Sequence, residues 1–405
     1  MPIGKPFGRK PVEKSSRLYE DRIKNAGKTP VEKASWSGVA SLAGFMACLV
    51  AAGAFCISSG QVAVGIGLIV FGVVPCLAII AMANNVVTQF MDGTRGASFP
   101  QASAESFGPD AERAFAIANK ALSKPELEAA EANRKAESEA TKDWYEANRP
   151  SFDDVSVTSE DNLRLVGHVL EANPGSGNWL IYAHGLGGGW KNGLGIGRHF
   201  AEKGYNLLFV DMRAQGDSAG TVIGGGHLER RDLVQWCRWL AERSGEGSGI
   251  VLMGSSLGGA AVLEAAGEKD LPQQVRAVIS DSAFADFWNE AIHVMGTMGA
   301  NGKALPAHPL LDVVRLIFRS RKGGYDIAEP SAVDAVAHAQ APLLFIHGAD
   351  DQLVAPYNAV RLDEAATAAG IDHELLQVPS AGHCCAAMAD PELYYGTIFG
   401  FIDRH

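Results

Sequence analysis

The 405-residue sequence is poor in charge and in cysteine. Only 20% of its residues are Asp, Glu, Lys or Arg, below the roughly 25% of a typical soluble domain, and 47% are hydrophobic. This apolar content is enough for a large core and excludes a mainly disordered chain. Six cysteines are too few for a disulfide scaffold, and the 46 glycines show no collagen period.

Charge is also distributed unevenly along the chain. Residues 1–35 contain nine Lys or Arg and four Asp or Glu, a net charge of +5, so that the rest carries −16 and the whole chain −11. An acidic body argues against nucleic acid as a partner, because phosphate binding requires a basic surface. The basic segment is therefore better explained together with residues 36–91, which follow it.

Charged residues are absent from residues 36–91. Two apolar runs, 39–58 and 62–83, fill this stretch and are separated by a short polar break. About 20 apolar residues in a helix cross a hydrocarbon core ~30 Å thick. We therefore predict a transmembrane helical hairpin. Small residues let such helices approach closely, and the sequence offers several. Among them are Gly44, Gly65 and Gly72.

Other interpretations of the two runs are a signal peptide, a buried soluble hairpin, and one span followed by a re-entrant segment. A signal peptide has a single apolar region of ~7–15 residues, so two longer runs argue against it. Lys and Arg favour the cytoplasmic face of a membrane. The basic segment 1–35 is therefore expected in the cytoplasm, and two spans of the cell membrane would return residues 92–405 to the same side.

Residues 92–150 are predicted to form a linker and a helical stalk. Acidic residues at 109–112 indicate a first helix start. Ser123, followed three residues later by Glu126, has the pattern of a capping box and indicates a second. Alanine and charged residues dominate up to Pro150, which ends the run. This composition favours a solvated helix, and a partner-binding helix is the alternative.

From residue 151 to 405 the pattern changes to short apolar runs that alternate with helical patterns. Such alternation predicts βαβ units and an α/β domain with a mainly parallel sheet. The predicted strands are 155–158, 163–170, 179–183, 206–211, 249–254, 277–281, 342–347 and 374–378. The predicted helices include 226–241, 256–266, 356–368 and 391–402.

A G-x-S-x-G motif lies between an apolar strand and an apolar helix, at Gly254, Ser256 and Gly258. In a nucleophile elbow the serine occupies a sharp strand-to-helix turn, and the glycines leave room for the neighbouring backbone. A glycine-rich helix start is the other interpretation of the string. The strand–turn–helix context favours Ser256 as a nucleophile.

A second glycine-rich turn, His184-Gly185-Leu186-Gly187, follows the predicted strand 179–183. Such a turn can direct a backbone N–H at a developing oxyanion. We expect the N–H groups of Leu186 and Leu257 to form the oxyanion hole. A phosphate-binding loop is disfavoured, because the G-x-x-x-x-G-K-[ST] spacing is missing.

An acid and a base must follow the serine in the order Ser, Asp or Glu, His. Asp350 and Asp351 end the predicted strand 342–347, and His383 follows the strand 374–378. His383 would take the proton of Ser256, and one of the two carboxylates would orient its imidazole. No cofactor or metal site is expected, because the eleven histidines are scattered and the nearest cysteine pair is adjacent in sequence.

Residues from about 154 to 405 resemble the α/β-hydrolase superfamily and are most similar to bacterial membrane-anchored hydrolases of the serine-peptidase-like branch. The matching strings are His184-Gly185, Asp211-Met212-Arg213-Ala214-Gln215-Gly216-Asp217-Ser218, the G-x-S-x-G motif, His347-Gly348 through Pro356, and Gly382-His383. The resemblance implies an α/β-hydrolase fold, with a mostly parallel eight-stranded sheet, flanking helices and a helical cap.

The resemblance also selects the acid, because the family places it three residues after the glycine, at Asp351. Two positions depart from the family pattern: Ala214 replaces a glycine, and Ala355 stands where proline is usual, with Pro356 one residue later. Relatives with a single anchor would place the enzyme outside the cell, which conflicts with the charge bias. We keep the cytoplasmic expectation.

These features predict a membrane-anchored serine hydrolase that cleaves an ester, thioester or amide through an acyl-enzyme. Residues 287–330 are predicted to form a cap rich in apolar side chains, among them Met298 and Phe318. An apolar cap near a membrane favours an acyl or lipid-like substrate, and an ordinary packed helix pair explains the same residues. The alternative function is a catalytically silent membrane scaffold, against which the intact Ser, Asp and His set argues.

Overall fold

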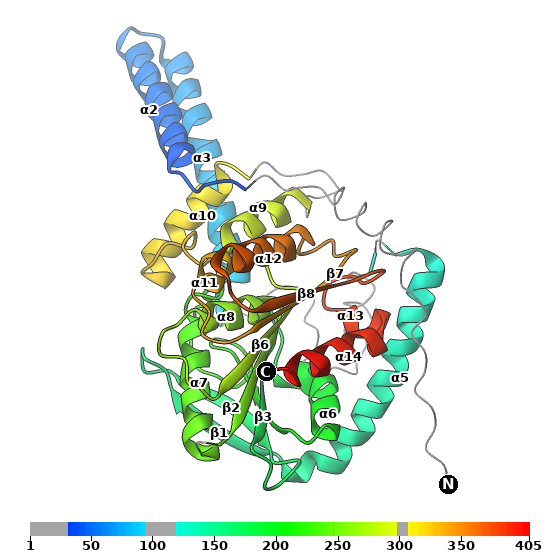
Figure 1. The fold of residues 1–405 in the computed structure, drawn as a ribbon. Coiled ribbons are helices and arrows are strands. Elements are labelled where there is room, and N and C mark those ends of the chain that lie inside the picture. Colours follow the sequence, from blue (N-terminus) through cyan, green and yellow to red (C-terminus); the bar gives the residue numbers. More distant parts are fainter. Residues whose placement is uncertain (1–30, 94–118, 121, 246, 298–306) are drawn as a thin grey trace, which may run out of the picture.

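The computed structural model describes residues 31–93, 119–120, 122–245, 247–297 and 307–405 (Figure 1). Most of the basic segment, the expected helix start at 109–112 and Met298 of the cap lie outside these residues. A two-helix hairpin projects from one end of a larger α/β domain (Figure 1).

The hairpin consists of α2 (Ser37–Ser58) and α3 (Val62–Phe90). Both helices are long and apolar enough to cross a membrane. They cross closely at glycines, because a Cβ on Gly65 would lie 2.4 Å from the carbonyl oxygen of Gly53. Gly72 also lies in the contact, as predicted, whereas Gly44 faces open space and that part of the prediction is wrong.

The base of the hairpin packs on the domain through α10 (Leu310–Phe318), as Figure 1 shows. The end of α3 contributes Ala83, the last residue of the predicted span, and Val87, beyond it, to an apolar cluster with α10. The ring of Trp36 lies 4.0 Å from the guanidinium carbon of Arg315. Within the predicted cap region, α10 therefore packs as an ordinary helix against the end of α3.

The domain contains one eight-stranded sheet with the strand order β1-β2-β4-β3-β5-β6-β7-β8. β2 is antiparallel to both of its neighbours, and the remaining pairs are parallel. The predicted fold is confirmed, and each predicted strand is present within two residues at either end. The strands are β1 (Asp153–Thr158), β2 (Arg164–Leu170), β3 (Asn178–Ala183), β4 (Asn206–Val210), β5 (Gly249–Ser255), β6 (Val275–Asp281), β7 (Leu343–Gly348) and β8 (His373–Val378).

Helices cover both faces of the sheet and enclose two apolar cores. One core lies between the sheet and α7, α8, α11 and α12, and the other between the sheet and α5, α6, α13 and α14. α6 is a helix that the sequence reasoning missed. The bounds of the remaining helices are α5 (Lys124–Asn148), α6 (Leu194–Glu202), α7 (Glu229–Ser244), α8 (Leu257–Ala266), α9 (Phe287–Thr297), α11 (Ala332–Val336), α12 (Tyr357–Ala369), α13 (Ala386–Ala389) and α14 (Pro391–Ile402). Short 3-10 turns lie at Arg149–Ser151 and Trp190–Gly193, and a π-helical turn at Arg319–Gly323.

α5 corrects the expectation of a solvated stalk. The predicted capping box is present, and the N–H of Ser123 donates to Glu126 Oε2 at 2.9 Å. One face of the helix is buried against the domain through Ala130, Thr141 and Tyr145, and α5 runs along the side of the domain in Figure 1. The buried face is small and partly polar, so a hydrophobicity pattern does not reveal it.

Candidate active site

Ser256 occupies the sharp turn between β5 and α8. Its backbone has φ of 55° and ψ of −118°, a strained conformation for a residue with a side chain. The glycines around it are required by close backbone approach. A Cβ on Gly254 would lie 2.3 Å from the Gly258 carbonyl oxygen, and one on Gly258 would lie 2.3 Å from that of Ala183. The geometry is that of a nucleophile elbow.

The structure brings Ser256, His383 and Asp351 together in one hydrogen-bonded line. The Ser256 hydroxyl lies 3.0 Å from His383 Nε2, and His383 Nδ1 lies 2.7 Å from Asp351 Oδ2. The three residues follow β5, β8 and β7, whose carboxyl ends meet at one edge of the parallel sheet. This edge is where open α/β sheets place their ligands.

Neighbouring side chains lower the pKa of Asp351 and raise the pKa of His383 against the effect of burial. Burial opposes the charge of Asp351, but His383 and His347 hold the pKa of this carboxyl well below its ordinary value. Burial likewise acts to lower the pKa of His383, but the charge of Asp351 outweighs it, and the pKa of the imidazole rises well above 6.5. A carboxylate that stabilises an imidazolium is the electrostatic arrangement that general-base catalysis by histidine requires.

Three further groups contact Asp351, and the sequence does not indicate this role for them. The N–H groups of Leu353 and Val354 each donate to Asp351 Oδ1 at 2.9 Å. His347, taken from the sequence only as part of a family string, lies 3.3 Å from Asp351 Oδ2 through its Nε2. In the sequence, the only indication of this contact is that His347 precedes Asp351 by four residues at the end of a predicted strand.

The two expected oxyanion donors are Leu257, which follows Ser256, and Leu186, whose neighbour Gly185 lies close to Ser256. Leu257 is the first residue of α8, so its N–H has no partner within the helix. In the described part of the chain, the N–H of Leu186 forms none of the loop hydrogen bonds. The glycine-rich turn lies against the serine, since a Cβ on Gly185 would be 3.2 Å from Ser256 Cβ.

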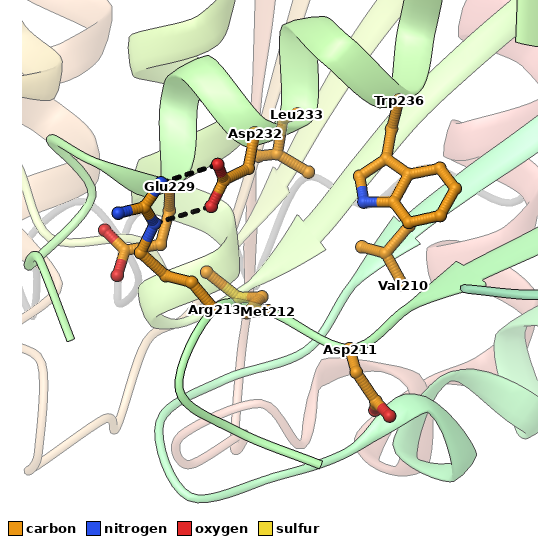
Figure 2. Close-up of a pocket in the computed structure, with 8 residues that line it drawn as sticks. All are labelled: Val210, Asp211, Met212, Arg213, Glu229, Asp232, Leu233 and Trp236. Carbon is orange, nitrogen blue, oxygen red and sulfur yellow. Dashed lines mark hydrogen bonds and ion pairs between the residues drawn. The ribbon is translucent and has the colours of Figure 1, made fainter. Parts of the chain in front are cut away.

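The family string at residues 211–218 has a structural role beside the site. Ala214 adopts φ of 60°, which explains why glycine is usual at this position. Arg213 is buried and donates twice to Asp232 of α7, at 2.6 and 2.7 Å (Figure 2). This pair lines the small cavity shown in Figure 2, together with residues of α7. Ser256 is not among the lining residues.

One group of described residues has a spacing that could hold a metal ion: His168, Asp211 and Asp217. Hydrogen bonds already engage its atoms. His168 Nδ1 lies 2.7 Å from Asp154, and Asp211 accepts the N–H groups of Trp190 and Asp217 at 2.9 Å. The third member, Asp217, is exposed. This group is therefore explained as a network that fixes the loop.

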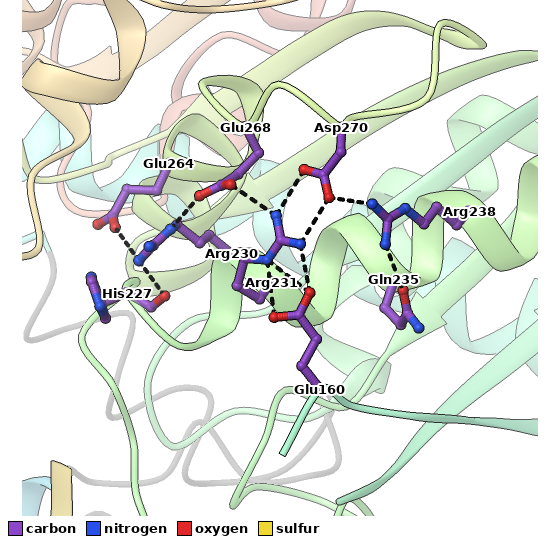
Figure 3. A network of polar contacts seen from close by, with 9 residues as sticks. All are labelled: Glu160, His227, Arg230, Arg231, Gln235, Arg238, Glu264, Glu268 and Asp270. Carbon is purple, nitrogen blue, oxygen red and sulfur yellow. Dashed lines mark hydrogen bonds and ion pairs between the residues drawn. The ribbon is translucent and has the colours of Figure 1, made fainter. Parts of the chain in front are cut away.

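A second network, on the side of the domain, is built around Arg231 of α7 (Figure 3). Arg231 donates to Glu160, Glu268 and Asp270. Its members are partly exposed, and ion pairs of this kind stabilise a fold only modestly. The network ties α7 to the end of α8 and to the turn before β2.

The fold agrees with comparisons to known families. The model of the X-Pro dipeptidyl-peptidase (S15) family matches residues 114–313, and that of the prolyl oligopeptidase family matches residues 312–405. Together with the eight-stranded sheet, these matches show that the chain belongs to the α/β-hydrolase superfamily. The same matches support a hydrolase activity for the chain.

Individual relatives are distant. The chain is 28% identical over 187 residues to the uncharacterized protein YqkD of Bacillus subtilis, covering 46% of this chain and 59% of that protein. It is 25% identical over 262 residues to the alpha/beta hydrolase domain-containing protein WAV2 of Arabidopsis thaliana, covering 63% and 79%. The Pyrococcus furiosus esterase Pf2001 is similar in structure, with a TM-score of 0.48 and 22% identity over 62% of this chain and 90% of that one. The chain thus spans about three fifths of the length of YqkD.

Proposed function

We propose that the protein is a membrane-anchored serine hydrolase that cleaves an ester, thioester or amide through an acyl-enzyme. The observation that carries this proposal is the position of His383, within hydrogen-bonding distance of both Ser256 and Asp351. A scaffold without activity would have no need of a strained serine at the end of this line.

In the proposed mechanism, Ser256 Oγ attacks the acyl carbonyl while His383 Nε2 takes its proton. Asp351 holds the Nδ1–H of His383 and stabilises the imidazolium. The N–H groups of Leu186 and Leu257 stabilise the oxyanion of the tetrahedral intermediate. His383 then gives its proton to the leaving group, and a water molecule repeats the sequence to release the acid and free Ser256.

The proposed anchor is the hairpin of α2 and α3, in the cell membrane. Both ends of the hairpin contact the domain, because Trp36 lies on Arg315 and the carbonyl of Met91 accepts the N–H of Ile223 at 3.1 Å. The domain and the start of α2 are therefore on the same side of the proposed membrane. The +5 charge of residues 1–35 supports the cytoplasmic side.

An acyl or lipid-like substrate is the class that this placement favours. The base of the hairpin packs directly on the domain, which would bring the hydrolase close to the bilayer surface. A substrate with an acyl chain could then be taken from the membrane without crossing bulk water.

The experiment is a comparison of wild type and Ser256→Ala on p-nitrophenyl esters and acyl-thioesters of increasing chain length. We expect hydrolysis by wild type only, with a preference for longer chains that reports an apolar acyl site. Equal turnover by the two proteins would contradict the assignment of Ser256. Turnover that does not depend on chain length would contradict the lipid-like substrate.

A further inference from the structure

The loop that carries His383 is also held by residues that precede β1, the first strand of the sheet. Asn119, in the short stretch before α5, is buried with 1% of its surface exposed. Its Oδ1 accepts the N–H of Gly382 at 3.2 Å, and its Nδ2 donates to Cys385 Sγ at 3.1 Å. One amide side chain therefore contacts the loop on both sides of His383.

α5 adds further contacts to the same loop. Glu126 accepts a hydrogen bond from the hydroxyl of Ser380. Ala130 packs against Cys385 in a small apolar cluster that includes Met388. Asn133 Nδ2 donates to the carbonyl oxygen of Met388 at 2.7 Å. The contacts extend along the loop and into α13, and those of Asn119 are the ones next to His383.

The loop needs such support because its backbone is strained. Ser380 and Cys384 both have left-handed φ angles, 55° and 53°, which are unfavourable for residues other than glycine. Within the domain, the N–H of Cys384 donates to Ser282 Oγ at 3.0 Å. A strained loop persists only where its surroundings fix it, and Asn119 supplies two of the fixed points.

We propose that Asn119 is a positioning residue that holds the imidazole of His383 in line with Ser256 and Asp351. This inference rests on the proposed function, since it assigns Asn119 a role in the same reaction. Asn119 then belongs to the catalytic unit, although it precedes the first strand of the hydrolase sheet.

The test compares Asn119→Ala with Asn133→Ala in the full chain, with a p-nitrophenyl ester as substrate. Asn133 bonds to the same interface but away from His383, so its variant controls for general loosening of α5. A misplacement of about 1 Å can cost about 100-fold in rate. We expect Asn119→Ala to lower kcat roughly 10- to 100-fold with KM within about twofold, and Asn133→Ala to keep both.

Two more readouts separate positioning from a loss of stability. The acidic limb of the kcat/KM profile should move to lower pH in Asn119→Ala, because an imidazole that drifts from Asp351 loses the charge that raises its pKa. Asn119→Asp keeps the oxygen that accepts the Gly382 N–H and should recover part of kcat.

Equal kcat in the two alanine variants, or an unmoved acidic limb, would overturn the inference while leaving the proposed function intact. A wild type that neither hydrolyses the ester nor reacts with a fluorophosphonate would overturn the proposed function, and this inference with it.

Discussion

Asp351 and its neighbour Asp350 show what a single residue contributes to the site. The strand end allowed either carboxylate as the acid, and family spacing selected Asp351. In the structure Asp351 is buried and bonds to His383 at 2.7 Å. The choice depends on which side chain turns inward after β7, and a pattern of residue types does not encode this.

Replacing Asp351 by Asn tests that assignment. We expect a fall in kcat of roughly 10³- to 10⁴-fold, because the imidazole loses both its orientation and its counter-charge. The acidic limb of the pH profile should also shift to lower pH, since Asp351 is what raises the pKa of His383. Steady-state kinetics across pH measure both effects. Asp350→Asn is the matched control and should retain activity within a few-fold, and the reverse ranking of the two variants would exclude Asp351 as the acid.

Glu264 of α8 predicts a pH dependence of stability. Burial raises the pKa of its carboxyl from 4.5 to about 8 in the folded protein. Between these values the unfolded chain releases a proton that the folded chain keeps, so stability falls as pH rises from about 4.5 to about 8.

Glu264→Gln removes this titration, and its melting temperature should rise relative to wild type across that window. The corresponding gain in the free energy of unfolding should level off above pH 8 and amount to a few kcal/mol at most. Thermal denaturation from pH 5 to 9 measures it, with the exposed Glu242→Gln as control. A constant difference between the Glu264 variant and wild type at all pH values would show that the carboxyl is ionised in the fold.

At the scale of elements, the sequence predicts those with strong local patterns. The eight strands and the G-x-S-x-G turn are specified by apolar runs and glycines within a few residues. α5 was predicted as a helix but not as a packed one, because its buried residues Ala130, Thr141 and Tyr145 form no apolar stripe. The contacts of Asn119 with residues more than 260 positions away have no local signature.

The contact between the hairpin and α10 is tested by Gly38→Val. A Cβ at Gly38 would lie 1.8 Å from Oδ2 of Asp312, a fully buried carboxyl. The larger side chain must separate α2 from α10 and should cost about 1–3 kcal/mol, as overpacking usually does. Hydrogen exchange of Leu310–Phe318 should increase. Gly44→Val, where nothing lies within 4 Å, should leave exchange unchanged, and an equal response of the two variants would show that the hairpin and cap are independent.

At the scale of the whole molecule, the proposed function requires a hydrolase that is fixed to a bilayer. Two helices of 22 and 29 residues with no charged side chain should keep the protein in the membrane pellet after alkaline carbonate extraction. Detergent should release it. Recovery in the carbonate supernatant would instead support the buried soluble hairpin.

Orientation is a separate question, which protease protection answers. The domain should be cleaved in inside-out vesicles and protected in right-side-out ones, because the basic segment favours the cytoplasm. Cleavage of the domain in right-side-out vesicles would contradict the cytoplasmic placement.

The central claim is that Ser256 is a nucleophile activated by His383. Labelling of the full-length protein in membranes with a fluorophosphonate probe, followed by mass spectrometry of the modified peptide, tests it most directly. We predict one modified residue, Ser256, in wild type, and no labelling of Ser256→Ala. An unlabelled wild type, or equal labelling of the two proteins, would contradict it.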